Sequence, residues 1–152
     1  MLKQIEHFSQ LDFSQLLQIY AEPDGHLLSH RKYAGFYEDT LGHLNDPGCS
    51  IALWVVKDRY CCAVRMLPYQ DGFLLAGLQT LREERGKGYA TALLKALIAM
   101  RNHRGALYVH IHKKNRASLR LHEECGFVQI MDHALLLDGT VSSSYSTYCL
   151  KD

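Results

Sequence analysis

The sequence predicts a mixed α/β fold with a mostly antiparallel central sheet and helices on both faces. Three observations predict it. Two helical patterns come early, three strand-like segments joined by short turns occupy residues 50–81, and a helix–strand–helix order with a closing hairpin follows. A length of 152 residues suits one domain, so we expect a single domain over residues 1–152.

The N-terminal part predicts a strand and two helices. Residues 2–8 have strand character, and Ser9 or Asp12 is a candidate N-cap for the first helix. That helix ends at Pro23-Asp24-Gly25, and the second spans residues 29–44 and stops at Asn45-Asp46-Pro47-Gly48. Apolar residues recur at helical spacing in both segments: Phe13, Leu16, Leu17 and Tyr20 in the first, and Tyr33, Phe36, Tyr37, Leu41 and Leu44 in the second.

Three strands come next. Residues 50–57 and 60–69 are expected to form strands that are joined at Asp58-Arg59. Gln70-Asp71-Gly72 has the chemistry of a hairpin turn. Residues 73–81 are apolar almost throughout, which predicts a strand covered on both faces.

The second half alternates helices and strands. Helices are expected at residues 88–100 and 115–124, with Gly126 ending the second. Between them, residues 106–112 form a strand. One face of this strand carries Leu107, Val109 and Ile111, and the other carries Tyr108, His110 and His112. Residues 127–137 and 144–150 are expected to form a final hairpin around Asp138-Gly139-Thr140.

Composition excludes several classes of protein. Hydrophobic residues make up 47 % of the chain and charged residues 22 %, and the net charge of +1 argues against a nucleic-acid binder that works through bulk charge. The five cysteines are odd in number and lack C-x-x-C spacing, so we expect a reducing, cytoplasmic location and no metal site. No apolar run reaches the roughly 18 residues that span a bilayer, and no secretory signal is evident, so no membrane association is expected.

The segment from Arg82 to Ala90 predicts an anion site. It lies between an apolar strand and a long helix, whose first turn offers free backbone N–H groups and partial positive charge. Gly86 and Gly88 allow a phosphate to approach the backbone closely, and Arg85 and Lys87 add positive charge. The nucleotide P-loop pattern is absent, and so is the third glycine of the dinucleotide fingerprint. A helix start with flexible glycines and solvated charges is the simpler alternative for this segment alone.

Two motifs in register resemble those of the GNAT N-acetyltransferase superfamily. Arg85-Gly86-Lys87-Gly88-Tyr89-Ala90 matches the R-x-x-G-x-A acetyl-CoA motif. Residues 115–127, Asn-Arg-Ala-Ser-Leu-Arg-Leu-His-Glu-Glu-Cys-Gly-Phe, are similar to N-x-x-[AS]-x-x-L-Y-x-x-x-G-F. The order of the elements also fits this family over nearly the whole chain.

The resemblance implies a site for acetyl-CoA, which serves as cosubstrate. The strand ending near Leu81 would splay from the one ending near His112, and pantetheine would pair with backbone at Leu78, Gln79 and Thr80. The pyrophosphate would lie on the amides of Gly86, Lys87, Gly88, Tyr89, Ala90 and Thr91 beside Arg85, and Asn115 would orient the pantetheine arm.

The resemblance also implies direct transfer of an acetyl group to an amine. Where many relatives carry a tyrosine acid, this chain has His122, a candidate to protonate the leaving thiolate. His110, where some relatives have a glutamate, is the candidate base, and His112 is a weaker one. Simpler interpretations remain: His122 as a helix-face residue without a role, and His110 as a buried, hydrogen-bonded residue. Glu83 and Glu84 are expected to be solvated loop charges. Cys125 is expected to pack rather than to act as a nucleophile.

The acceptor is less defined. The family places it between the early helices and the closing hairpin, where His26, His30, Tyr33, Tyr37 and residues 140–145 lie. These residues fit ordinary helix packing equally well. The expected partner is a small amine or a peptide, and the chain is expected to be a monomer or homodimer. Two alternatives are a non-catalytic acyl-CoA sensor and a module that binds another phosphorylated ligand.

Overall fold

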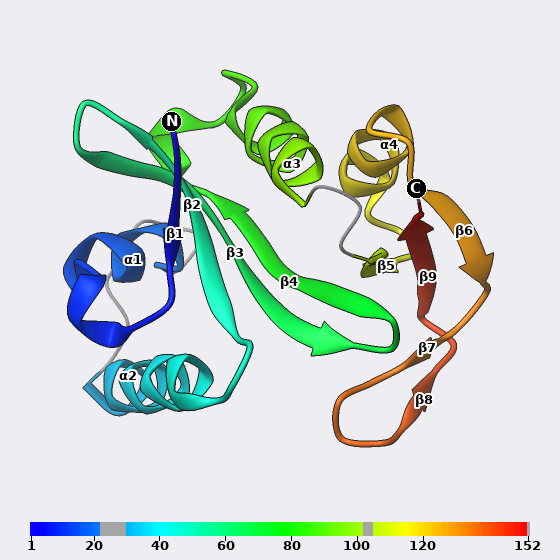
Figure 1. Ribbon diagram of the computed structural model, residues 1–152, viewed down its shortest axis with the longest axis horizontal. Helices are drawn as coiled ribbons and strands as arrows, with labels where there is room; N and C mark the ends of the chain where they lie inside the picture. Colours follow the sequence, from blue (N-terminus) through cyan, green and yellow to red (C-terminus); the bar gives the residue numbers. More distant parts are fainter. Residues whose placement is uncertain (22–29, 102–104, 152) are drawn as a thin grey trace.

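The computed structural model describes residues 1–21, 30–101 and 105–151 and contains a seven-stranded mixed sheet (Figure 1). The strand order is β1-β2-β3-β4-β5-β9-β6, and every neighbouring pair is antiparallel except β4 and β5. The predicted fold class is therefore confirmed. The strands of this sheet are β1 (Leu2–Ile5), β2 (Ser50–Val56), β3 (Arg59–Tyr69), β4 (Gly72–Thr80), β5 (Leu107–His112), β6 (Val128–Met131) and β9 (Tyr145–Leu150).

Helices cover both faces of the sheet. In the described residues the α-helices are α1 (Phe13–Ile19), α2 (His30–Asn45), α3 (Tyr89–Met100) and α4 (Arg116–Glu124). Side chains of α1 and α2 share a buried cluster with Ile51, Leu53 and Ala63. Side chains of α3 and α4 pack on a second cluster that contains Ala52 and Val64. Successive strand residues point to opposite faces, so α1 and α2 lie on one face and α3 and α4 on the other.

The first residues depart slightly from expectation. β1 ends at Ile5, and Phe8–Gln10 form a 3₁₀ helix instead of extending the strand to residue 8. Of the two candidate caps, Asp12 is the N-cap of α1, because its side chain accepts a hydrogen bond from the Gln15 backbone N–H at 3.3 Å. Ser9 lies within the 3₁₀ helix. The expected stop at Pro23-Asp24-Gly25 lies outside the described residues.

The β2–β3 turn lies one residue earlier than expected. Lys57 and Asp58 have φ values of +50° and +65°, and Arg59 already belongs to β3. Two consecutive left-handed residues form the type I′ geometry whose twist matches that of a hairpin. The sequence hides this turn because neither residue is glycine or asparagine.

The closing hairpin is also different from the expected pair of long strands. Residues 127–137 are not one strand: β6 pairs with β9, while β7 (Ala134–Leu135) and β8 (Val141–Ser142) form a separate two-stranded sheet. A register shift between Gln129 and Met131 breaks the β6 ladder. The Thr147 hydroxyl then donates a hydrogen bond to the His133 carbonyl at 2.8 Å, which holds the bend that redirects the chain.

None of the helices in the described part of the chain has both the length and the apolar character that crossing a bilayer requires.

Candidate functional site: a splayed strand pair beside the start of α3

The parallel strands β4 and β5 separate along their length. They pair through only three residue pairs, from Phe73↔Leu107 to Leu75↔Val109. Residues 76–80 of β4 have no partner on β5, and His110 to His112 of β5 pair only with β9. Figure 1 shows the two strands diverging. The splay that the family resemblance implied is therefore present.

A β-bulge in β4 accounts for the separation. Ala63 pairs with Gln79, but Arg65 pairs with Ala76, so β4 contains one extra residue between these pairs. Gly77 lies in this stretch with φ of +69°, a conformation that other residues rarely adopt. A bulge bends its strand and increases the local twist, which turns the end of β4 away from β5.

The gap between the strands holds a cavity of about 310 Å³. Its walls come from β4, β5 and α4, and they include Leu78, His110, Asn115, Ser118 and His122. A neighbouring cavity of about 440 Å³ continues toward the start of α3, and its walls include Leu78, Gln79, Thr80, Arg85, Ala90 and Asn115. The structure thus brings together most of the residues that the sequence assigned to the coenzyme.

The open edge of β4 presents backbone hydrogen-bonding groups to this gap. The Leu81 N–H donates to the Cys61 carbonyl on β3 at 2.8 Å. Because backbone groups alternate in direction along a strand, those of Thr80 and Leu78 point to the opposite edge, into the gap. An extended ligand can pair with them as a neighbouring strand would.

The start of α3 is open to an anion. Gly88 is its N-cap with φ of +81°, and Gly86 has φ of +79°. Within the described part of the chain, no backbone N–H from residues 86–91 donates a hydrogen bond. A Cβ added at Gly86 or Gly88 would meet no atom within 4 Å. Free amides, open space and the positive end of the helix dipole are what a phosphate requires.

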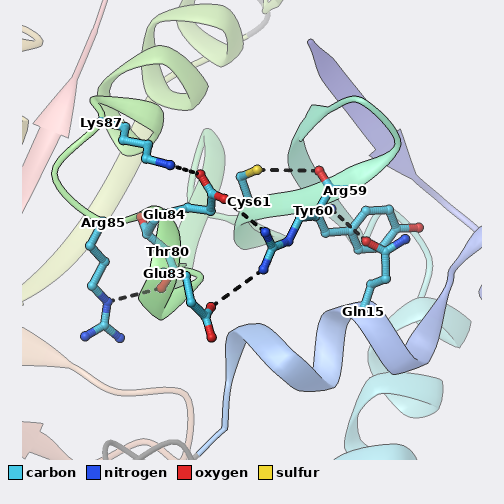
Figure 2. A network of polar contacts seen from close by, with 9 residues as sticks. All are labelled: Gln15, Arg59, Tyr60, Cys61, Thr80, Glu83, Glu84, Arg85 and Lys87. Atoms are coloured by element: carbon cyan, nitrogen blue, oxygen red, sulfur yellow. Dashed lines mark hydrogen bonds and ion pairs between the residues drawn. The ribbon is translucent and has the colours of Figure 1, made fainter.

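Both cations that were expected to add positive charge at this loop already have partners in the structure. The Lys87 ammonium lies 2.8 Å from Glu84, which also accepts a hydrogen bond from Arg59 at 3.1 Å (Figure 2). The Arg85 Nε donates to the Thr80 carbonyl at 3.3 Å. The Glu84 side chain is only 13 % exposed, and the hydrogen bond from Lys87 lowers its pKa. The expectation that Glu84 is a solvated charge is therefore wrong, because two cations hold it against the loop.

His122 is a buried, neutral ring. It is 1 % exposed and packs edge-on against Phe127, with ring centroids 5.2 Å apart. Its Nδ1 lies 2.7 Å from the Ser118 carbonyl, which can only accept, so Nδ1 carries the hydrogen. Its Nε2 is buried with no hydrogen-bond partner among the described residues. Burial lowers its pKa, so at neutral pH the free Nε2 holds a lone pair rather than a proton.

His110 borders the same cavity from the other side of the sheet. Its ring packs edge-on against Tyr69 at 5.8 Å, on the face opposite Leu107, Val109 and Ile111. Its Nε2 is also buried without a partner in the part of the chain that is described, and burial lowers its pKa. The predicted alternation of this strand is confirmed. His110 approaches the gap from the face of α1 and α2, and His122 from the face of α3 and α4.

The remaining candidates have defined contacts. Asn115 is the N-cap of α4, since its Oδ1 accepts from the Ser118 N–H at 3.1 Å. His112 accepts from the Lys114 N–H through Nδ1 and packs against Tyr145. Burial raises the pKa of Cys125, so this thiol is not activated as a nucleophile.

The residues expected near an acceptor are only partly described. Tyr33 and Tyr37 pack edge-on against Phe13, which favours the helix-packing interpretation for these two residues. His26 and the side chain of His30 lie outside the described parts of the structure. Among the described residues, no group of three His, Cys, Asp or Glu side chains is placed to hold a metal ion.

Comparisons with known proteins identify the family. The model of the acetyltransferase (GNAT) family matches residues 11–127. No curated protein sequence matches the chain.

Solved structures share the fold at low sequence identity. A spermidine N-acetyltransferase chimera from Vibrio cholerae and hSSAT has a TM-score of 0.71 and 16 % identity, covering 99 % of this chain and 94 % of that one. The Escherichia coli ribosomal-protein-S18-alanine N-acetyltransferase has a TM-score of 0.65 and 15 % identity, with 99 % and 93 % covered. An IAA acetyltransferase from Bacillus cereus has a TM-score of 0.66 and 14 % identity, with 100 % and 99 % covered. Because the family model matches most of the chain and includes both motifs, the chain belongs to the acetyltransferase (GNAT) family.

Proposed function

We propose that this protein is an N-acetyltransferase that moves an acetyl group from acetyl-CoA directly to a primary amine of a small molecule or peptide. One observation carries the proposal: the unpaired edge of β4 leads to the free amides at the start of α3. This arrangement matches an extended thioester arm that ends in a pyrophosphate. We treat residues 1–152 as one domain, and its cytoplasmic location and its state as monomer or homodimer stay predictions.

The coenzyme would lie along the splay. Leu78 and Thr80 would pair with the pantetheine arm through the backbone groups that face the gap, and Gln79 would lie between them, with its backbone paired to β3. The amides of residues 86–91 would bind the pyrophosphate, and Arg85 would lie beside it. Asn115 borders both cavities, and its Oδ1 is used in capping α4, so its amide N–H₂ is the group that would contact the arm.

The acceptor amine has to lose a proton. An alkyl amine has a pKa of about 10.4, so it arrives protonated at neutral pH. His110 is already neutral there because burial lowers its pKa, and its Nε2, which has no hydrogen-bond partner among the described residues, accepts a proton at the gap when the ring hydrogen is on Nδ1. We assign His110 as the base, acting directly or through a water molecule. The backbone N–H groups near Thr80 would polarise the thioester carbonyl.

His122 is proposed as the acid for the departing thiolate, but its tautomer allows this only when the ring is protonated. Nδ1–H is committed to Ser118, so only an imidazolium ring can donate from Nε2. The acid role therefore strengthens as pH falls, and at high pH the thiolate leaves unprotonated.

The burial and the tautomer of His122 favour a second candidate function. A buried neutral ring stands where many relatives carry a tyrosine acid, and this would suit a non-catalytic acyl-CoA sensor. Such a protein binds acetyl-CoA with no turnover on any amine. Spermidine and a ribosomal-protein alanine appear in the names of two structural neighbours, which favours amine acetylation in this fold.

The test is release of free thiol from acetyl-CoA over a broad panel of amines and peptides. The proposal expects amine-dependent thiol release and an acetylated product confirmed by mass spectrometry. Tight binding of coenzyme A without turnover would favour the sensor. Absence of binding would refute both.

A further inference from the structure

An arginine that the proposed function does not use lies beside the splay. Arg65 is an exposed residue of β3, and within the described part of the chain it forms neither an ion pair nor a side-chain hydrogen bond. It helps to line a cavity of about 200 Å³ between the sheet and the helices α1 and α2, together with Tyr20, Phe36 and Asp39. The proposed roles of the coenzyme residues and the two histidines do not use this arginine.

Arg65 lies at the bulge that opens the gap. A Cβ on Gly77 would be 3.6 Å from both its Nε and its Nη2, and 3.6 Å from the Tyr20 hydroxyl oxygen. That hydroxyl donates to the Gly77 carbonyl at 2.6 Å. Gly77 also borders the cavity in the gap. The guanidinium is therefore adjacent to the place where β4 leaves β5.

The guanidinium and the proposed base share one face of the sheet. Arg65 and Ala63 are two residues apart on β3, and Ala63 packs toward α1 and α2. Tyr69 follows on the same face and contacts the His110 ring. An acceptor whose amine reaches His110 from this face approaches across the same side of the sheet that carries Arg65.

Within the described part of the chain, no neighbouring group forms an ion pair with Arg65. Burial raises the pKa of Tyr20, so its hydroxyl stays neutral. Burial lowers the pKa of His43, which also stays neutral and whose Nε2 contacts the Ser50 carbonyl at 2.8 Å. Asp39 lines the same cavity but forms no ion pair with Arg65 in the described structure.

We propose that Arg65 selects acceptors that carry an anionic group, a carboxylate above all, a few bonds from the amine. This inference rests on the proposed function and names its substrate class. A guanidinium binds a carboxylate through paired N–H donors, which fixes the orientation of the acceptor as well as its charge. The same charge repels a second ammonium group, so polyamines are poor acceptors for this protein. A free amino acid and a peptide with an acidic side chain near its terminal amine share this chemistry.

The test compares matched acceptors in the wild type and in Arg65→Gln. The first pair is γ-aminobutyrate and its amide, and the second is a peptide with Glu as its second residue and the same peptide with Gln. For the preferred carboxylated acceptor, kcat/KM is expected to fall about tenfold in Arg65→Gln, the typical effect of losing one charge-assisted hydrogen bond. For its neutral partner, the change should be clearly smaller, about twofold, because a guanidinium donates a weaker hydrogen bond to an uncharged amide carbonyl than to a carboxylate. A response in the first pair would indicate a free amino acid as the acceptor, and a response in the second would indicate a peptide.

Two further variants separate recognition from folding. Arg65→Lys keeps the charge and is expected to recover part of the preference. Asp39→Asn removes the nearby carboxylate and should leave the preference in place. An equal loss on charged and neutral acceptors in Arg65→Gln would show a structural role and overturn the inference. Equal kcat/KM for charged and neutral acceptors in the wild type would also overturn it while leaving acetyl transfer intact. Turnover on no amine at all would instead refute the proposed function.

Discussion

Replacement of Gly88 by glutamate tests the phosphate site at the start of α3. Gly88 has φ of +81°, so any other residue costs about 1–2 kcal/mol in backbone strain. A side chain there enters open space, since no atom lies within 4 Å of its Cβ position. The glutamate carboxylate would therefore occupy the volume that the pyrophosphate needs, beside the free amides of residues 86–91.

The expected loss of affinity follows from Coulomb's law. Two unit charges about 4 Å apart repel by about 1 kcal/mol in water and about 4 kcal/mol at the effective dielectric constant of a protein surface. The dissociation constant of coenzyme A should rise by a factor of about 5 to several hundred. Titration calorimetry with coenzyme A alone measures it without any acceptor. Gly88→Ala carries the strain without the charge and should lose less.

Gly139 supplies a matched control. It has φ of +86° and also has no atom within 4 Å of its Cβ position, but it lies in the loop between β7 and β8, far from the start of α3 in Figure 1. Gly139→Glu therefore has similar strain and the same added charge, and it should bind coenzyme A like the wild type. Equal affinity of Gly88→Glu and Gly139→Glu for coenzyme A would refute the phosphate-site reasoning.

Four more outcomes follow from the site. Glu84→Gln removes an anion from the loop and should tighten coenzyme A binding about twofold to fivefold at low salt, with a smaller gain at high salt, as calorimetry at two ionic strengths would show. If His122 is the acid, the kcat ratio of wild type to His122→Phe should grow as pH falls from 8 to 6, and a ratio that is constant with pH would contradict that role. Burial lowers the pKa of His43, His110 and His122, so the unfolded chain takes up more protons below its histidine pKa of about 6.5. The free energy of unfolding should then be constant above that pH and fall below it, by at most about 1.4 kcal/mol per pH unit for each histidine. Urea titrations at several pH values measure this, and they would show no such fall if the three rings were charged in the folded protein. Asn115→Asp keeps the cap of α4 but loses the amide N–H₂, so it should keep the melting temperature within about 3 °C while raising the KM for acetyl-CoA, whereas an unchanged KM would remove Asn115 from the coenzyme site.

Much of the fold could be predicted from the sequence because its signals are local. The apolar spacing of α1 and α3, the alternation of β5 and the glycine-rich start of α3 each depend on a few neighbouring residues. The family motifs then placed the coenzyme residues, and the structure brings most of these together. Where β6 ends was less predictable, since a register shift and the Thr147 hydroxyl bond come from a strand far along the chain.

The charges of the site were the hardest to predict. The ion pair of Lys87 with Glu84 could not be predicted, because it depends on the 3₁₀ turn (Arg82–Glu84) that brings Glu84 back toward Lys87. Arg59 reaches the same carboxylate from β3 across 25 positions of sequence. The bulge at Gly77 had a sequence signal, an isolated glycine in an apolar strand, but only the pairing register reveals that it opens the sheet.

The short β4–β5 pairing has a mechanical consequence. Three residue pairs between β4 and β5 join the part of the sheet made of β1 to β4 to the part made of β5, β9 and β6. A ligand that pairs with the open edge of β4 adds hydrogen bonds at this junction, so it also stabilises the contact between the two parts. The stability of the protein should then rise with cosubstrate concentration. Backbone amides of β4 and β5 should exchange their hydrogens more slowly when the ligand is bound.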